Sequence, residues 1–334
     1  MTKYSNLRYS RRIKYFFGIG ATGLCLVIFF FQINLSDTLL VLQEFKWSFL
    51  FFAIIFLACG YAFRIKRWSL MLRLAGADTN FWDCSAPFLG SIALNNILPL
   101  RLGDVVRAFF FPNSMGITKT LSAGTLLIER LLDLLAISCF FTVALFISNQ
   151  ILLPIELRST LIVFGSFGVG TLLFFFLFSK RLELFFLNFS NSTKKSNRII
   201  NAYLFCSKFL SNFHAILKLK ALSALMSITA IIWMAEAGLF YFVMLGAGLE
   251  ADFTIAVFVM SVTTLSTLIP SSPGYVGTFH LAAFAALTSK GINVPEAASA
   301  SIMIHMALWL PTTLIGIFAM WTRPELIVWA KIAK

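Results

Sequence analysis

The chain has 334 residues, of which 59% are hydrophobic and only 12% are charged, whereas soluble domains carry about 25% charged residues. A water-soluble fold of this length cannot cover its surface with so few polar groups, so the composition excludes that class. Lys and Arg number 27 against 14 Asp and Glu, which in a membrane protein first indicates cytoplasmic loops and anionic headgroups rather than nucleic acid. We expect an all-α polytopic membrane protein whose partners are membrane lipids, with no nucleic acid; a homo-oligomer is left open.

Long apolar runs follow one another along the chain and predict about six full transmembrane helices. The first run, residues 15–33, follows a basic start and lacks a small-residue cleavage pattern, so we expect it to stay as a signal anchor. The next run, residues 47–63, ends in the basic stretch 64–73, which is predicted to be a cytoplasmic loop. The remaining spans are expected at residues 121–147, 157–178, 221–245 and 297–321.

Two further apolar segments, residues 81–111 and 253–289, are too interrupted to be simple spans. Proline lacks an N–H group and clashes with the preceding turn, so it breaks a helix. Each segment is therefore predicted to be a re-entrant hairpin that enters and leaves the bilayer by one face. The breaks are Pro99 and Gly103 in the first hairpin, and Pro270, Pro273, Gly274 and Gly277 in the second.

The two hairpins share a Pro-x-x-x-Gly pattern when Pro99 is aligned with Pro270. Each hairpin is followed by one long apolar run, which predicts an inverted repeat of residues 47–147 and 221–321 within one integral membrane domain, residues 1–334. In such repeats the broken segments meet near the midplane around a substrate.

The distribution of Lys and Arg predicts the orientation in the membrane. Most basic residues lie in the N-terminus, in segments 64–73, 101–119 and 180–220, and in the tail. The positive-inside rule then puts both termini in the cytoplasm. We expect the protein to lie in a bacterial inner membrane. On this orientation the first hairpin enters from the cytoplasm and the second from outside.

The cytoplasmic segment 180–220 contains an apolar stripe from Ile199 to Leu217 at helical spacing. We expect an amphipathic helix that lies at the headgroups or extends the next span. The alternative is a helix that binds a partner protein.

The stretch Asn95–Arg107 is the most unusual in the chain. Pro99 is predicted to end the incoming helix, Gly103 to permit the reversal, and Asp104 to cap the returning helix. The freed amides beside Arg101 and Arg107 form an expected anion site suited to a phosphate headgroup. The alternative is that Arg101, Asp104 and Arg107 form a structural ion-paired cluster. The candidate substrate-binding residues in the two hairpins are Asn95, Asn96, Arg101, Gly103, Asp104, Arg107, Ser271, Ser272, Gly274, Tyr275, Gly277 and His280.

Ionisable residues also lie within the predicted spans. Glu129 and Asp133 share a helix face, and Arg130 is three residues from Asp133, so they are expected to form a charge-compensated cluster. Charges in lipid are costly, so these side chains should face the interior of the bundle, either as functional groups or as pairs that lock helices together. Glu236 and His305 complete the predicted intramembrane polar network. No metal-ligand constellation, disulfide framework or nucleotide-binding motif is visible, and no cofactor is expected.

Three motifs, taken together, resemble the flippase-like transmembrane region of lysylphosphatidylglycerol synthases. They are Asn96–Arg107, Glu129–Asp133 and Pro273–His280, in this order, and the resemblance covers nearly the whole chain. In that family the membrane region is associated with moving a modified phospholipid across the bilayer, while a separate cytosolic domain transfers the aminoacyl group. The resemblance implies a stand-alone translocator. The chain departs from the common pattern at His280 and His305, where the family has Glu and often Arg.

We therefore expect a translocator that moves an anionic phospholipid or a lipid-linked sugar, and not an enzyme. An integral-membrane enzyme with Glu129, Asp133 or His280 as acid and base is the alternative, and a membrane scaffold or regulator is a third. The lipid, the direction of transport and the coupling ion do not follow from the sequence.

Overall fold

The computed structural model describes residues 20, 22–147, 155–192, 197–216, 218–250, 252–268 and 272–326. All regular structure in this part of the chain is helical, as predicted. Four helices are long and apolar enough to cross a membrane: α3 (Trp47–Leu74), α6 (Lys119–Ile147), α9 (Leu219–Gly246) and α12 (Val294–Thr322). The chain is thus an all-α polytopic membrane protein, while the number of six spans stays a prediction.

The first predicted span is not straight in its described part. The helix Thr22–Gln32 is followed by α2 (Leu35–Gln43), and the two meet at an angle of 84°. The side chain of Asn34 caps α2 by accepting a hydrogen bond from the Ser36 N–H, which fixes the start of the second helix after the bend. The pair becomes a fifth span only if both helices are counted together.

Both predicted hairpins are broken pairs of helices. The first consists of α4 (Phe81–Ile97), the short 3-10 turn η1 (Pro99–Arg101) and α5 (Leu102–Phe109). The second consists of α10 (Phe253–Ser266), η3 (Pro273–Tyr275) and α11 (Thr278–Thr288). Between the first hairpin and α6 lies a second 3-10 turn, η2 (Phe111–Met115), and η4 (Pro324–Leu326) follows α12.

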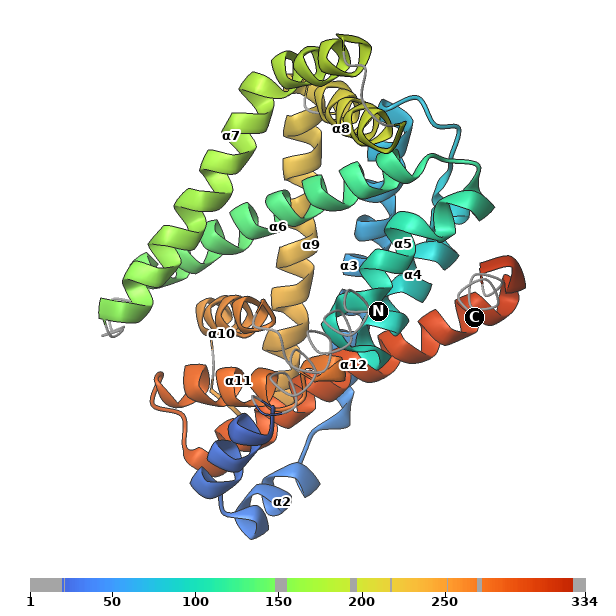
Figure 1. Cartoon of the computed structure of the whole chain (residues 1–334). Helices are drawn as coiled ribbons and strands as arrows, with labels where there is room; N and C mark the ends of the chain where they lie inside the picture. Colours follow the sequence, from blue (N-terminus) through green and yellow to red (C-terminus); the bar gives the residue numbers. More distant parts are fainter. Residues whose placement is uncertain are drawn as a thin grey trace, which may run out of the picture.

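The long helices and the hairpins exchange partners between the two halves of the chain (Figure 1). α4 packs against α12, whereas α10 packs against α6, and the tips η1 and η3 contact each other. α3 packs along α9 in the opposite direction, because the N–H of Lys46 donates to the Gly246 carbonyl at 2.8 Å. Equivalent helices of the two halves thus run antiparallel, and each hairpin packs against the long helix of the other half. This arrangement is expected of an inverted repeat.

The fourth expected span and the polar stretch after it form a helical hairpin. It consists of α7 (Ile155–Ser192), which includes the expected span 157–178, and α8 (Asn197–Ile216), which holds the predicted amphipathic stripe. Leu210 and Phe213 of this stripe are buried, and the Phe213 ring lies 4.8 Å from that of Phe175 in α7. Leu217 lies outside the described residues.

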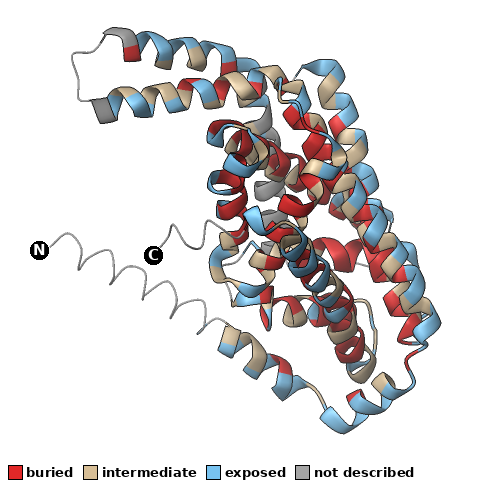
Figure 2. Cartoon of the chain, turned by 90° about the vertical axis from the view of Figure 1, so that its right-hand side faces the viewer, coloured by how far each residue is buried: buried red, intermediate tan, exposed pale blue. Residues whose placement is uncertain are grey.

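The outer surface of the bundle differs from that of a soluble protein, and Figure 2 shows where its exposed residues lie. Large apolar side chains are exposed on the outer helix faces, such as Phe146 at 77% and Trp321 at 73%, while charged side chains lie between the helices. Lipid solvates apolar side chains and penalises charged ones, so this distribution fits a bilayer environment.

The helix α3 corrects one prediction. The basic stretch 64–73 is not a loop, because α3 continues to Leu74, and Arg67 is fully buried while the side chain of Arg64 is 12% exposed. Arg64 pairs with Glu236 and Arg67 with Asp133, both on helices that follow much later in the chain. These carboxylates compensate the two positive charges inside the bundle. These two arginines therefore do not count toward a cytoplasmic loop.

Candidate functional site

Two residues at the tip of the first hairpin have a strained backbone conformation. Leu98 is extended, as expected before a proline, and Leu100 and Arg101 then adopt left-handed conformations with φ of 57° and 53°. Such values are costly for residues with a Cβ and persist only where surrounding contacts fix them. The tip therefore places the Arg101 side chain in one defined direction.

Gly103 and Asp104 have different roles from those predicted. Gly103 lies inside α5 and not at the reversal, and a Cβ there would overlap the Ser91 carbonyl oxygen of α4. Its role is to let α5 pack directly on the α4 backbone. Asp104 is not the N-cap of α5, since Arg101 occupies that position.

Two asparagines hold the first hairpin in place. Asn95 bonds to Asp104 twice: its Oδ1 accepts from the Asp104 N–H at 3.0 Å and its Nδ2 donates to the carboxylate at 2.9 Å. Asn96 Nδ2 donates to the hydroxyls of Thr312 and Thr313 on α12, at 3.0 and 2.8 Å. The first bonds join α4 to α5, and the second bonds join the hairpin to the other half of the chain.

The tip of the second hairpin repeats this geometry in a different register from the predicted one. Pro273, Gly274 and Tyr275 form a 3-10 turn in which Gly274 and Tyr275 have φ of 67° and 58°. The structural counterpart of Pro99 is therefore Pro273 and not Pro270. Pro270 and Ser271 lie outside the described residues.

Gly274 brings the second tip against α4 and α12. A Cβ there would lie 2.6 Å from Trp309 Nε1 and 3.2 Å from the Asn96 carbonyl oxygen. His305 Nε2 lies 2.8 Å from the Gly274 carbonyl oxygen, so it is the donor of that bond. His280 caps α11 instead, with Nδ1 accepting from the Gly277 N–H at 3.3 Å, and its ring lies 4.6 Å from that of His305.

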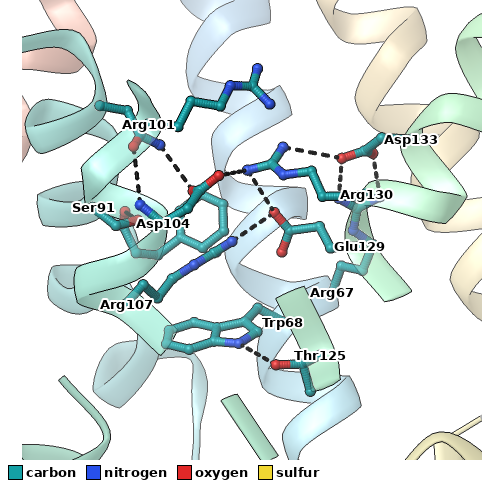
Figure 3. A network of polar contacts seen from close by, with 12 residues as sticks. Arg67, Trp68, Ser91, Arg101, Asp104, Arg107, Thr125, Glu129, Arg130 and Asp133 are labelled. Carbon is teal, nitrogen blue, oxygen red and sulfur yellow. Dashed lines mark hydrogen bonds and ion pairs between the residues drawn. The ribbon is translucent and has the colours of Figure 1, made fainter. Parts of the chain in front are cut away.

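Four arginines of the interior each have a carboxylate partner, and Figure 3 shows the pairs of Arg67, Arg107 and Arg130. The shortest distances are 2.8 Å for Arg64 to Glu236, 2.7 Å for Arg67 to Asp133, 2.9 Å for Arg107 to Glu129 and 2.8 Å for Arg130 to Asp104. Arg64 and Arg67 join α3 to the distant segments α9 and α6, whereas the pairs of Arg107 and Arg130 join the consecutive helices α5 and α6. A buried pair of this kind is costly to break, because the remaining charge has no compensation.

Arg107 is part of this network and not an open anion site. Its side chain is 1% exposed, and its guanidinium lies 4.7 Å from the centre of the Phe88 ring and 5.2 Å from that of Trp68. It is thus held between aromatic rings and the Glu129 carboxylate. Of the two arginines predicted to bind a headgroup, Arg107 is therefore buried and paired, and it is not available to a headgroup.

Arg101 differs from the other four arginines. Its Nε donates to the Tyr275 hydroxyl at 2.6 Å and its Nη2 to the Thr267 hydroxyl at 3.3 Å, and both partners are neutral. Among the described residues no carboxylate oxygen lies within 4 Å of its guanidinium, and in Figure 3 it extends away from the carboxylates. Within the described part of the chain Arg101 therefore has no ion-pair partner for its positive charge.

A central cavity of about 180 Å³ lies where the two tips meet. At about 15 Å³ per molecule it has room for on the order of ten waters, so it admits a small polar group. Its wall combines charged side chains with aromatic ones, including Trp233 and Trp309. The charged side chains in the wall are Arg64, Arg101, Glu129, Arg130, Asp133 and Glu236.

The structure brings about half of the candidate residues to this cavity. Asn95, Asn96, Arg101, Gly274 and Tyr275 line it, together with the whole predicted polar network of Glu129, Arg130, Asp133, Glu236 and His305. Gly103, Asp104, Arg107, Ser272, Gly277 and His280 are not in its wall.

Sequence reasoning missed several residues of the site. The sequence predicts that Arg64 and Arg67 lie in a loop, because several basic residues directly after an apolar run are typical of the end of a span. The cavity wall also contains Tyr61, Trp233 and Thr267, which no sequence pattern marks as site residues because they lie within apolar runs. The spacing of Arg64 and Arg67 on one side of a continuous helix was the one available indication.

Comparison with known proteins places the chain in a family. The model of the lysylphosphatidylglycerol synthase transmembrane region matches residues 15–316. The chain belongs to this family of polytopic membrane proteins, which gives it a role related to membrane lipids.

Two curated archaeal relatives match the chain. The UPF0104 membrane protein of Methanocaldococcus jannaschii is 26% identical over 223 residues, which cover 67% of this chain and 91% of the relative. The glycosyltransferase AglD of Haloferax volcanii is 22% identical over 348 aligned positions, which cover 92% of this chain and 54% of the relative. The chain thus matches about half the length of the glycosyltransferase.

Proposed function

We propose that the protein is a translocator that moves an anionic phospholipid or a lipid-linked sugar between the two leaflets, without altering it covalently. The observation that carries the proposal is Arg101, which faces a central cavity between two broken hairpins and has no carboxylate partner among the residues that the structure describes. Arginine binds phosphate through several parallel N–H donors, so this position suits a lipid headgroup.

The arrangement of the halves supports movement of the headgroup through the bilayer. Inverted repeats with broken helices alternate access by rocking one half against the other around a fixed central site. Here the antiparallel pair α3 and α9 lies between the halves, and the tips η1 and η3 meet at the cavity. The apolar outer faces of the helices leave the acyl chains in lipid while the headgroup occupies the cavity.

The two alternatives have weaker support. As acid and base of an enzyme, Glu129 and Asp133 would have to exchange protons, but both carboxylates are held by buried arginines at 2.9 and 2.7 Å. A scaffold that acts through the stripe of α8 would need that stripe uncovered, but Leu210 and Phe213 are buried within the chain, and Ile199 at its start is the exposed residue of its described part. The predicted membrane, a bacterial inner membrane with both termini cytoplasmic, is part of the proposal and rests on the distribution of Lys and Arg.

The test is a leaflet-exchange assay in proteoliposomes that contain fluorescent phosphatidylglycerol. We expect the protein to speed the loss of label protection from the inner leaflet, and Arg101→Gln to abolish this. Arg73→Gln, which changes an exposed arginine at the end of α3, is the matched control and should transport normally. Mass spectrometry of the lipids should show no new species. Normal exchange by folded Arg101→Gln protein, or a covalently altered lipid, would refute the proposal.

A further inference from the structure

The wall of the cavity holds three arginines and three carboxylates, but the whole ion-pair network to which they belong, with the buried residues behind the wall, does not balance. The network contains five arginines, Arg64, Arg67, Arg101, Arg107 and Arg130, and four carboxylates, Asp104, Glu129, Asp133 and Glu236. Each carboxylate has its own arginine, which leaves the single positive charge of Arg101. This sum counts His305 as a neutral imidazole, whose Nε2–H donates to the Gly274 carbonyl.

An unbalanced charge inside a bundle sets the charge of the ligand that fits best. In a low-dielectric interior a net charge is penalised, and a ligand that neutralises it is favoured. A group with one negative charge leaves the cavity neutral. A group with two negative charges or with a net positive charge leaves it charged again.

We infer that the cavity selects lipids whose headgroup carries one net negative charge in a phosphodiester, and discriminates against both phosphomonoester and aminoacylated, cationic headgroups. This inference rests on the proposed function and narrows its substrate class. A phosphodiester carries one negative charge at neutral pH, whereas a phosphomonoester carries about 1.5 to 2. A lysyl ester of phosphatidylglycerol carries one negative and two positive charges.

The geometry at Arg101 agrees with a diester. A guanidinium has five N–H donors, and the bonds to Tyr275 and Thr267 engage only two of its nitrogens, Nε and Nη2. The remaining donors can hold the two free oxygens of a diester in parallel. The apolar side chains Phe88, Ile92 and Leu308 in the same wall suit the glycerol and the start of the acyl chains.

Binding measured in detergent tests the inference independently of transport. The probes are dihexanoyl phosphatidylglycerol, dihexanoyl phosphatidic acid at pH 8, dihexanoyl phosphatidylcholine and the lysyl ester of the first, and the signal is tryptophan fluorescence. We expect the first probe to bind about tenfold more tightly than the choline and lysyl lipids, and at least about threefold more tightly than phosphatidic acid. Equal or tighter binding of the lysyl lipid or of phosphatidic acid would overturn the inference.

Variants at Arg101 provide a second test, in which the order of the four affinities changes and not only their strength. Arg101→Gln should bring the four affinities within about twofold of one another, and Arg101→Glu, which makes the net charge negative, should reverse the order in favour of the lysyl lipid. Arg73→Gln should keep the wild-type order. An unchanged order in Arg101→Glu protein would overturn the inference. Selective binding without leaflet exchange would refute the proposed function alone, whereas exchange that prefers the lysyl lipid would refute this inference alone.

Discussion

Arg101 and Tyr275 occupy the same position in two different hairpins and bond to each other. Each is the third residue of a proline-led 3-10 turn, each has a left-handed backbone, and the Arg101 Nε donates to the Tyr275 hydroxyl at 2.6 Å. The guanidinium also lies 5.5 Å from the centre of the tyrosine ring. The contact between the two halves at the cavity is therefore made by the group that we propose binds the headgroup.

The first prediction concerns competition for Arg101. The Tyr275 hydroxyl accepts from Nε, so without it Nε becomes a further donor for a phosphate oxygen beside those already free, and Tyr275→Phe should strengthen binding of dihexanoyl phosphatidylglycerol about fivefold, which equals about 1 kcal/mol. The phenylalanine keeps the ring beside the guanidinium. Fluorescence titration of both proteins checks this, with Tyr241→Phe on α9, which is not in the cavity wall, as the control. Weaker binding by Tyr275→Phe would show that the hydroxyl positions Arg101 and does not compete for it.

The second prediction concerns the buried pair of Arg67 and Asp133. Two hydrogen bonds of 2.7 and 3.1 Å join them, and the Arg67 side chain is fully buried. Asp133→Asn leaves the guanidinium charge uncompensated and should destabilise the protein by about 3–5 kcal/mol. The thermal unfolding midpoint in detergent should fall accordingly. The double variant Arg67→Met with Asp133→Leu removes both charges and should recover most of the loss; no recovery would contradict the account.

The third prediction tests the packing of the first hairpin. Gly103→Ala places a methyl group against the Ser91 carbonyl oxygen of α4 and should cost about 3 kcal/mol through overpacking. Gly124→Ala is the matched control, since a methyl there meets its nearest atom at 3.7 Å, an ordinary contact distance. The two unfolding midpoints should differ by several degrees. Equal midpoints would mean that α5 can move away from α4 without loss.

The hairpins show what the sequence could and could not predict. Pro99 and Pro273 mark breaks that the sequence predicted, because a missing N–H and a steric clash act locally, although Pro87 and Pro311 lie inside α4 and α12 without ending them. The strained residues were not predictable: Leu100 and Arg101 carry the left-handed backbone, although Gly103 is nearby. The conformation there follows from contacts with the other tip, such as the bond to Tyr275. For the same reason letter matching aligned Pro99 with Pro270, while the geometry pairs it with Pro273.

Ion pairing across the bundle explains the other differences. A run of arginines after an apolar segment predicts a loop when its partners are unknown. The partners of Arg64 and Arg67 lie 172 and 66 residues away, on helices α9 and α6. The sequence thus indicated the charged residues of the spans but not which arginines would compensate them, and the pairing left Arg101 as the exception.

The last prediction concerns the pair Arg64 and Glu236, which lies between the antiparallel helices α3 and α9 at 2.8 Å. Arg64 is residue 18 of α3 and Glu236 is residue 18 of α9, so the two side chains come from equivalent positions of helices with equal length. If the two halves are equivalent, the surroundings of Arg64 in the first half therefore resemble those of Glu236 in the second. Arg64→Glu or Glu236→Arg alone places like charges together and should destabilise the protein by about 3 kcal/mol or more.

The exchanged protein, with Arg64→Glu and Glu236→Arg together, should regain most of this stability, because each new side chain enters an environment resembling the one it had. A double-mutant cycle of thermal unfolding measures the coupling, which we expect to reach about 3 kcal/mol, the upper end for residues in direct contact. Transport is the more sensitive readout, since the pair lines the cavity beside Arg101. If the exchanged protein is as unstable as the single variants, the two halves do not provide equivalent environments, and rocking about the α3 and α9 pair loses its support.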